Sequence, residues 1–421
     1  MNIMVVGGGG REHAIIKKIK ENPKVDVIYA LPGNGGIATD AVCVDIKATD
    51  INGITEFAKQ KNIDFAVVAP DDPLAAGCVN SLESAGIQCF GPRAEAAIIE
   101  SSKVFSKELM KKYNIPTAAY EVFDNMYTAL GYLDTAPMPT VIKADGLALG
   151  KGVIIAETVE DAKQAVREMM QERKFGSSGD RIVIEEFLTG PEVSVLSFTD
   201  GKDLVPMISS MDHKRQGDGD TGLNTGGMGA IAPNPYYTDE IAARCMREIF
   251  LPTIDAMNTE GRTFKGCLYF GLMLTEKGPK VIEYNCRFGD PETQVLMPLL
   301  KSDLLDIMMA VSEERLSEAE VTWEDKYSCC VVAASDGYPV KYEKGYEICI
   351  PDEILSDTYI AGAILEDGRL LTSGGRVLCV TATSDELATA IENAYQKLDE
   401  IDFANKYYRV DIGQKALKVV Q

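Results

Sequence analysis

A strand-like segment at residues 283–287 carries polar residues at alternate positions. If the segment is extended, the side chains of Glu283, Asn285 and Arg287 lie on one face. Two oxygen donors about 7 Å apart along a strand suit Mg²⁺, which keeps waters and phosphate oxygens as its other ligands. Arg287 could stabilise negative charge that develops beside the metal. The pattern predicts a metal-assisted reaction on an anion, and its alternative is chance charge alternation on an exposed strand.

Two further segments could hold a nucleotide. Residues 143–152 read KADGLALGKG, a lysine on a strand followed by a glycine loop that could close over a triphosphate. This run is not a Walker loop, because no Ser or Thr follows Lys151. Residues 185–192 read EEFLTGPE, where the strand end could meet adenine and Glu192 could reach the ribose. The alternatives are a plain hairpin turn and an ordinary strand end.

The first strand-like segment ends in a glycine turn. Residues 7–10 are all glycine and Arg11 follows, so free N–H groups, a helix N-terminus and a guanidinium could meet an anion. A second glycine loop at residues 33–36 would face the same crevice if the two strands are neighbours. The spacing is not G-x-G-x-x-G, so one phosphate fits better than a dinucleotide. The alternative is a tight turn that binds nothing.

Composition excludes several function classes. The chain has 421 residues and a formal charge of −22, which argues against a nucleic-acid-binding face. His13 and His213 are its two histidines, too few for a structural zinc site or a Ser–His–Asp triad. The ten cysteines include no C-x-x-C pair and are expected to be reduced thiols. No apolar run approaches 18 residues, so we expect a soluble, cytoplasmic protein without a membrane segment.

The pattern along the chain predicts three regions. In residues 1–100, strand-like segments alternate with helical ones at 11–22, 51–62 and 73–86, which predicts an α/β domain with a doubly wound parallel sheet. The strand-like segments are 2–7, 25–30, 41–46, 64–70 and 87–91. Such alternation places helices on both faces of the sheet.

Residues 101–326 form the second predicted region. It begins with an amphipathic helix at 101–115 and contains a smaller α+β unit at about 120–188. A polar loop at 212–230, a helix at about 239–260 and a β-hairpin at 267–292 follow. Residues 327–421 are strand-rich, with turns at SDGYP, EDGR and TSGGR, and form the third region.

The motifs occur in a recognisable order: GGREHA, PGN, KADGLALGKGV, IEEFL, NTGGMGA and NCRFGDPETQ. Over nearly the whole chain they resemble the glycinamide ribonucleotide synthetase family of the ATP-grasp superfamily. The resemblance implies an ATP-grasp central domain with a mobile lid subdomain, between the N-terminal domain and a small C-terminal domain. It also implies ATP-dependent ligation of glycine to 5-phosphoribosylamine in purine biosynthesis, through a glycyl phosphate and with Mg²⁺ or Mn²⁺. A monomer with at most transient contacts to neighbouring purine-pathway enzymes is expected.

The resemblance assigns roles to individual positions. Metal ligands would be Glu283 and Asn285, and the catalytic groups would be Arg287, Lys143 and Asp290. The expected ATP contacts are Lys103, Lys143, Gly146, Gly150, Lys151, Gly152, Glu185, Leu188 and Glu192. The expected substrate contacts are Gly8, Gly9, Gly10, Arg11, Asn34, Asp71, Asp212, Lys214, Asn224, Gly226, Gly227, Gly229, Arg287 and Gly289.

The chain departs from the family pattern in two places. Asp71 stands where the family often has glutamate, and residues 360–363 read IAGA where the family often has HAGT. Affinity for phosphoribosylamine could therefore differ, whereas the ATP chemistry should be unaffected. The chain ends after the third region, which points to a stand-alone, bacterial-type enzyme. Rival functions are a carboxylase-like relative that uses bicarbonate, a nucleotide sensor without turnover, and, more distantly, a dinucleotide oxidoreductase.

Overall fold

The computed structural model describes residues 1–147 and 152–420. Its N-terminal part is a parallel sheet in the order β3-β2-β1-β4-β5. The strands are β1 (Asn2–Gly7), β2 (Val27–Pro32), β3 (Val42–Cys43), β4 (Phe65–Val68) and β5 (Gln88–Phe90). The strand order reverses beside β1, so the carboxyl ends of β1, β2 and β4 border one crevice. The predicted doubly wound sheet is confirmed.

The helices of this part are α1 (Gly10–Ile19), α2 (Ile51–Gln60), α3 (Asp71–Ala75) and α4 (Cys78–Ser84). The single helix predicted at 73–86 is wrong, because Gly77 adopts a left-handed φ of +83° and divides it into α3 and α4. The strand predicted at 41–46 is shorter than expected, since only Val42 and Cys43 pair with β2. Helix α5 (Ala94–Ser101) was not predicted and precedes α6 (Lys103–Lys112).

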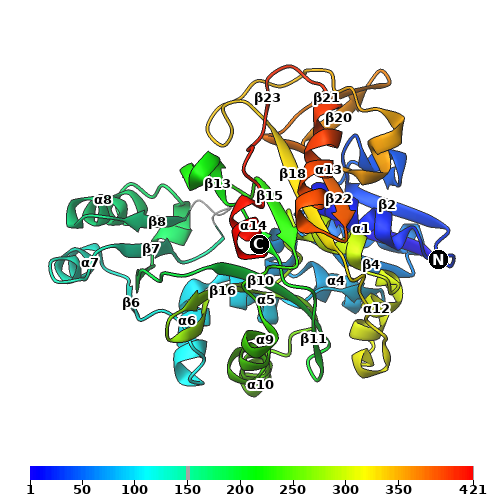
Figure 1. The fold of residues 1–421 in the computed structure, drawn as a ribbon. Coiled ribbons are helices and arrows are strands. Elements are labelled where there is room, and N and C mark those ends of the chain that lie inside the picture. Colours follow the sequence, from blue (N-terminus) through cyan, green and yellow to red (C-terminus); the bar gives the residue numbers. More distant parts are fainter. Residues whose placement is uncertain (148–151, 421) are drawn as a thin grey trace.

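An antiparallel sheet of order β6-β9-β7-β8 forms a separate lobe, seen protruding at the left of Figure 1. Its strands are β6 (Tyr120–Phe123), β7 (Thr140–Ala144), β8 (Val153–Ala156) and β9 (Ile182–Glu186). Helices α7 (Met126–Leu133) and α8 (Val159–Met170) cover one face and share a small core with it. The lobe coincides with the unit predicted at 120–188; its mobility as a lid stays a prediction.

A second antiparallel sheet lies beneath the lobe in the order β11-β10-β16-β17. Its strands are β10 (Glu192–Thr199), β11 (Leu204–Pro206), β16 (Gly266–Thr275) and β17 (Gly278–Asn285), so the predicted hairpin is confirmed. The helix expected at 239–260 is also present. It runs as α9 (Asp239–Cys245), a π-helical turn (Met246–Phe250) and α10 (Leu251–Thr259).

The C-terminal sheet has the order β12-β15-β18-β22-β19, and β23 (Lys406–Tyr407) also pairs with β18. Besides β23, three strands come from the third region: β18 (Tyr327–Ser335), β19 (Thr358–Ile360) and β22 (Arg376–Ser384). The hairpin β20 (Ala363–Glu366) and β21 (Arg369–Thr372) lies beside them, and α13 (Leu387–Asp399) packs on the sheet. This helix was not predicted. The chain then reaches α14 (Gln414–Val420).

The remaining two strands of that sheet, β12 (Met211–Asp212) and β15 (Gly229–Ala232), come from the second region. The loop predicted at 212–230 is therefore wrong, because it contains these strands and the hairpin β13 (Arg215–Gly217) and β14 (Thr221–Asn224). Its polar and glycine-rich composition shows no apolar alternation, so the strand signal is absent from the sequence. Within the described residues, no helix is long and apolar enough to cross a membrane.

Candidate active site

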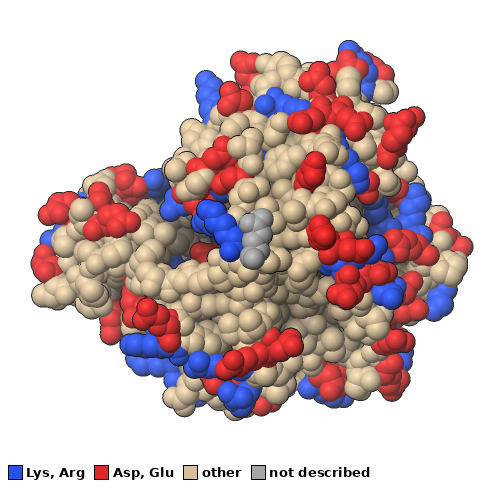
Figure 2. Space-filling view, viewed as in Figure 1, with Lys and Arg blue, Asp and Glu red and all other residues tan. Residues whose placement is uncertain are grey.

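A cavity of about 1070 Å³ lies between the lobe and the rest of the molecule. The space-filling view is visibly hollowed beside the lobe (Figure 2). Predicted site residues that line the cavity are Arg11, Asp71, Lys103, Lys143, Gly152, Glu185, Leu188, Glu192, Asp212, Lys214, Asn224, Gly226, Glu283, Asn285, Arg287 and Asp290. The structure therefore brings together residues that the sequence separates by more than 250 positions.

Two lysines share one carboxylate where the lobe meets α6. Glu185 on β9 lies 3.1 Å from Lys143 Nζ and 3.0 Å from Lys107 Nζ, and all three side chains are buried. Burial lowers the pKa of Lys107 to about 8, although the Glu185 carboxylate opposes that change. Two lysines against one carboxylate leave local positive charge that suits a phosphate chain. Lys107 was missed by sequence reasoning because it reads as one more lysine of an amphipathic helix.

Lys103 begins helix α6 and reaches the loop that follows β7. Its Nζ donates to the Gly146 carbonyl at 3.2 Å, and Gly146 has a φ of +147°. Burial lowers the pKa of Lys103, with Glu283 acting in the opposite direction. Gly150 and Lys151, two predicted ATP contacts, lie outside the described residues.

Glu283, Asn285 and Arg287 all reach the cavity from the end of β17. Burial alone would raise the pKa of Glu283, but Lys214, Lys143 and Lys103 outweigh it and lower the pKa. Glu283 is thus held as a carboxylate. Asn285 Oδ1 accepts a hydrogen bond from Arg287 Nη2 at 3.2 Å.

Arg287 is oriented by a buried carboxylate on α5. Its Nη2 lies 3.1 Å from Glu100 Oε1, while Glu100 Oε2 accepts from the Cys286 main-chain N–H at 2.7 Å. Arg287 Nε is buried and has no hydrogen-bond partner among the described residues. The guanidinium is therefore fixed in place, and its Nε–H is unpaired among the described residues. Sequence reasoning missed Glu100, since a lone glutamate in an unpredicted helix carries no signal.

The glycine turn and the second glycine loop touch each other. A Cβ built on Gly8 would lie 2.4 Å from the Gly33 carbonyl oxygen, so a side chain there would prevent the approach. Asn34 Nδ2 donates to the Gly8 carbonyl at 3.0 Å and to the Ile360 carbonyl at 2.8 Å. Gly8, Gly9, Gly10 and Asn34 do not line the cavity; their structural role is to shape the turn that presents Arg11.

Arg11 extends from that turn to the end of the hairpin. Its Nη1 donates to the Phe288 carbonyl at 3.1 Å, and its Nε pairs with Glu12 Oε1 at 2.6 Å. Glu12 Oε2 in turn accepts from the Gly9 N–H at 2.6 Å, which caps α1. Arg11 is thus held at the N-terminal end of the cavity.

Asp290 pairs with an arginine from the C-terminal sheet. Arg376 Nη2 lies 3.1 Å from Asp290 Oδ2, and its Nη1 donates to the Gly226 carbonyl at 2.7 Å. Arg376 lines the cavity but was missed, because its TSGGR context reads only as a turn. Gly227, Gly229 and Gly289 lie off the cavity and permit close packing instead. A Cβ on Gly289, for example, would lie 2.3 Å from Glu292 Oε2.

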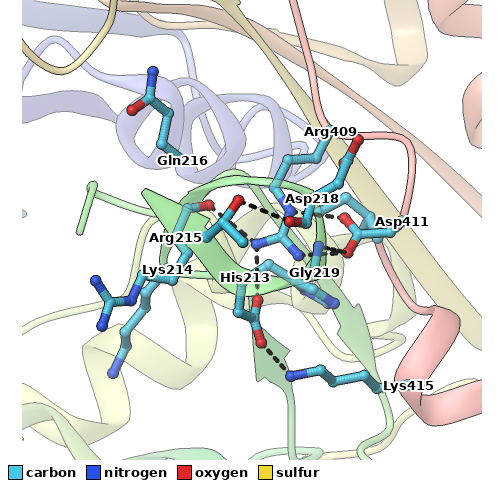
Figure 3. Close-up of polar contacts among 12 residues, drawn as sticks. His213, Lys214, Arg215, Gln216, Asp218, Gly219, Arg409, Asp411 and Lys415 are labelled. Carbon is cyan, nitrogen blue, oxygen red and sulfur yellow. Dashed lines mark hydrogen bonds and ion pairs between the residues drawn. The ribbon is translucent and has the colours of Figure 1, made fainter. Parts of the chain in front are cut away.

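The segment that carries Asp212, Lys214 and Asn224 is anchored by a fully buried arginine, drawn in Figure 3. Arg409 donates twice to the Asp411 carboxylate at 2.8 Å and once to the Arg215 carbonyl at 3.0 Å. It also lies 3.0 Å from Asp220 Oδ1. The β13–β14 hairpin is therefore attached to the C-terminal region.

Comparison with known proteins matches the chain to one family. Phosphoribosylglycinamide synthetase profiles match at residues 1–100 for the N domain, 101–293 for the ATP-grasp (A) domain and 328–415 for the C domain. The phosphoribosylamine–glycine ligase of Clostridium acetobutylicum is 47% identical over 414 residues, which cover 98% of this chain and 100% of the relative.

Solved structures agree with this match. The crystal structure of phosphoribosylamine–glycine ligase from Thermotoga maritima has a TM-score of 0.85 at 32% identity, covering 98% of this chain and 100% of that one. The biotin carboxylase domain of the Hydrogenobacter thermophilus 2-oxoglutarate carboxylase, 14% identical with a TM-score of 0.75, covers 100% of this chain and 98% of its own and shares the fold alone. Because family profiles match most of the chain and a relative of nearly half identity spans it, the chain belongs to the phosphoribosylglycinamide synthetase family.

Proposed function

We propose that this chain joins glycine to 5-phosphoribosylamine in an ATP-dependent ligation that yields glycinamide ribonucleotide, ADP and phosphate. The observation that carries this proposal is that one cavity is lined by the Lys143–Glu185–Lys107 cluster, by Arg287 and by Arg11. The cationic groups of the cluster, Arg287 and Arg11 are distinct, and the glycine carboxylate would bind at Arg287. A triphosphate, a small amino acid and a phosphorylated amine can therefore occupy one space together.

The nucleotide would bind between the lobe and the sheet beneath it. Lys143, Lys107 and Lys103 would hold the phosphate chain. Leu188 lines the cavity just after β9, where the strand end offers main-chain groups to adenine. Glu192 would reach the ribose once its present partner, Lys214 Nζ at 3.2 Å, is displaced.

The residues at the end of β17 suit a divalent cation. Glu283 supplies an ionised carboxylate and Asn285 an amide oxygen, which are hard ligands. No three His, Cys, Asp or Glu side chains cluster for a metal in the described part of the chain. A site with two protein ligands that leaves positions for waters and phosphate oxygens is typical of Mg²⁺ and also accepts Mn²⁺. Bound there, the ion would neutralise charge on the transferring phosphoryl group.

The chemical difficulty is that a carboxylate is a poor electrophile, because attack by an amine would have to expel oxide. Transfer of the γ-phosphoryl group to glycine makes an acyl phosphate with a good leaving group. Arg287, fixed by Glu100 and with Nε free, would orient the glycine carboxylate for in-line attack. The amine of phosphoribosylamine then attacks the acyl carbon, and phosphate leaves.

The phosphate of phosphoribosylamine would bind at the N-terminal end of the cavity. Arg11 provides the guanidinium, and Asp290 with Arg376 borders the same end. Asp71 also lines the cavity despite its shorter side chain. Residues 360–363, which contain no histidine, do not line the cavity; the Ile360 N–H donates to His13 and the Ile360 carbonyl accepts from Asn34.

The rival functions predict different requirements for residues, substrates and ligands. A nucleotide sensor has no need of the Arg287–Glu100 pair beside the metal ligands, and a carboxylase-like enzyme would use bicarbonate in place of glycine. A dinucleotide oxidoreductase would respond to NADH. The monomeric state, the cytoplasmic location and the preference between Mg²⁺ and Mn²⁺ stay predictions.

The deciding experiment measures phosphate release with each substrate omitted in turn. Rapid release should require ATP, Mg²⁺, glycine and phosphoribosylamine together, because a closed site suppresses transfer to water. Equal release with bicarbonate in place of glycine would support the carboxylase-like function instead. Binding of ATP without any turnover would support the sensor.

A further inference from the structure

An aspartate of the lobe contacts the start of helix α6. Asp145 directly follows β7, and its side chain is 6% exposed. Its Oδ1 accepts a hydrogen bond from the Val104 main-chain N–H at 3.1 Å and one from the Ser102 hydroxyl at 2.9 Å. Ser102 caps α6, because its own hydroxyl oxygen accepts from the Phe105 N–H at 3.1 Å. Asp145 and Ser102 thus satisfy N–H groups that the first helical turn cannot pair internally.

The second carboxylate oxygen of Asp145 is fixed within the lobe. Asp145 Oδ2 lies 2.5 Å from Arg181 Nη2, and the Asp145 N–H donates to the Arg181 carbonyl at 3.0 Å. Arg181 directly precedes β9, the strand that pairs with β7. The carboxylate therefore binds the lobe through one oxygen and α6 through the other.

A contact in the opposite direction joins the same two segments. Lys103, the first residue of α6, donates from Nζ to the Gly146 carbonyl at 3.2 Å. Gly146 is itself packed against the lobe, since a Cβ built on it would lie 2.4 Å from Ser178 Oγ. Residues 102–104 and 145–146 are thus held to each other twice, once by the Asp145 side chain and once by the Lys103 side chain.

The rest of α6 has other attachments. Further along the helix, Lys107 pairs with Glu185 of β9 at 3.0 Å, and two apolar residues are buried in the core beneath the lobe. Loss of the Asp145 contacts would therefore leave the helix in place and release only its first turn, which carries Lys103. Lys103 lines the cavity, whereas Asp145 does not.

We propose that Asp145 is a positioning residue that sets the place of the Lys103 ammonium in the cavity by holding the first turn of α6 against the lobe. The assignment rests on the proposed function, in which Lys103 holds the phosphate chain of ATP, and it adds a residue that acts only through that lysine. A lysine ammonium is a point charge on a flexible four-carbon stem, so an unanchored one loses more freedom when a phosphate binds. An anchored first turn reduces that cost before ATP arrives.

The test measures binding of a non-hydrolysable ATP analogue, with an imido group between the β- and γ-phosphorus, by calorimetric titration with Mg²⁺ present. Asp145→Ala should raise the Kd of the analogue about 5- to 30-fold, the effect expected when a side chain that caps a helix is lost. Asp145→Asn keeps an acceptor oxygen and caps a helix about as well as aspartate, so its Kd should stay within about twofold of the parent. Asp180→Ala, whose side chain is 53% exposed on the same lobe, is the matched control.

A positioning role requires that Asp145 act through Lys103. Lys103→Met should itself weaken binding of the analogue, and adding Asp145→Ala to it should change the Kd by less than about twofold, because the lysine that Asp145 places is gone. Additive losses in the double variant would show a general structural role and overturn the assignment. An unchanged Kd in Asp145→Ala, or in Lys103→Met, would overturn it as well.

If Asp145→Ala does not fold, judged by circular dichroism, Ser102→Ala removes one donor to Asp145 and carries the same comparison with and without Lys103→Met, with a smaller expected shift. A parent protein that binds the analogue but releases no phosphate with ATP, glycine and phosphoribosylamine would refute the proposed ligation and leave the assignment of Asp145 standing. A parent protein that does not bind the analogue would refute both.

Discussion

His213 Nε2 accepts a hydrogen bond from the main-chain N–H of Gly413, 3.1 Å away. His13 Nδ1 accepts one from the N–H of Ile360 at 2.8 Å. Both rings are buried and both donors belong to the C-terminal region. A ring nitrogen can accept only while it is unprotonated. In their neutral form, the two histidines of the chain thus hydrogen-bond the C-terminal region to the rest of the protein.

The stability of the protein should fall as the pH drops from about 6.5 to 4. Burial lowers the pKa of His213 to about 4 and also lowers that of His13, so each contributes stability above its unfolded pKa of about 6.5. That contribution disappears as the pH falls through the window, by about 3 kcal/mol for His213. Urea unfolding at several pH values measures it. His213→Gln should flatten the slope, and a parallel slope in the variant would contradict the assignment.

Arg409→Met should destabilise the C-terminal region. The change leaves Asp411 and Asp220 without their buried partner, and loss of one member of such a network costs about 3–5 kcal/mol. Thermal unfolding and proteolysis of the 213–220 segment measure the effect. Arg369→Met, at a 58% exposed position, is the control. A melting temperature equal to that of the control would show that the network is not important for stability.

Glu283→Ala should reduce turnover by several orders of magnitude without unfolding the protein. Without the Glu283 ligand, the metal ion would no longer neutralise the charge that develops on the γ-phosphate during transfer. Initial rates over a range of Mg²⁺ concentrations measure it. Glu276→Ala, in the exposed turn of the same hairpin, is the control. If the activity of Glu283→Ala stays within about threefold of that of the parent, Glu283 is not a metal ligand needed for turnover.

Arg11→Ala should raise the KM for phosphoribosylamine by about 10- to 100-fold and leave that for ATP unchanged. A charge-assisted contact to phosphate contributes about 1.5–3 kcal/mol, and the proposed sites for ATP and for the phosphate of phosphoribosylamine use different residues. Steady-state kinetics with one substrate varied at a time measure both constants. Arg93→Ala, whose side chain is 63% exposed, is the control. A selective loss of ATP affinity would show that Arg11 binds the nucleotide and not phosphoribosylamine.

Glycine labelled with ¹⁸O in its carboxylate tests the acyl-phosphate route. Each turnover should transfer one labelled oxygen to the released phosphate, because the carboxylate oxygen that attacks the γ-phosphorus leaves with it. Mass spectrometry of the phosphate measures the transfer. Unlabelled phosphate with amide product still formed would exclude the intermediate and favour prior phosphorylation of an enzyme group.

The sequence by itself determined the local elements and the family. Strands β1, β2 and β4 and the β16–β17 hairpin follow from apolar runs and turn residues, whose signal lies within a few neighbouring positions. The alternation of Glu283, Asn285 and Arg287 likewise predicted that their side chains share one face, and all three line the cavity. The ordered glycine-rich motifs then indicated the family over nearly the whole chain.

Only the tertiary structure decided which distant residues complete the site. Three pairs show this: Lys107 with Glu185, Glu100 with Arg287, and Arg376 with Asp290. Each pair joins residues that are far apart in the sequence, and no local pattern encodes such contacts. The pairing of β12 with β15 and of β15 with β18 was hidden as well, because both strands are short and the polar, glycine-rich segment between them shows no apolar alternation. Burial and charge at Asp212 also depend on loops brought together in space. A residue's ionisation and partners are properties of its surroundings, and the fold supplies those.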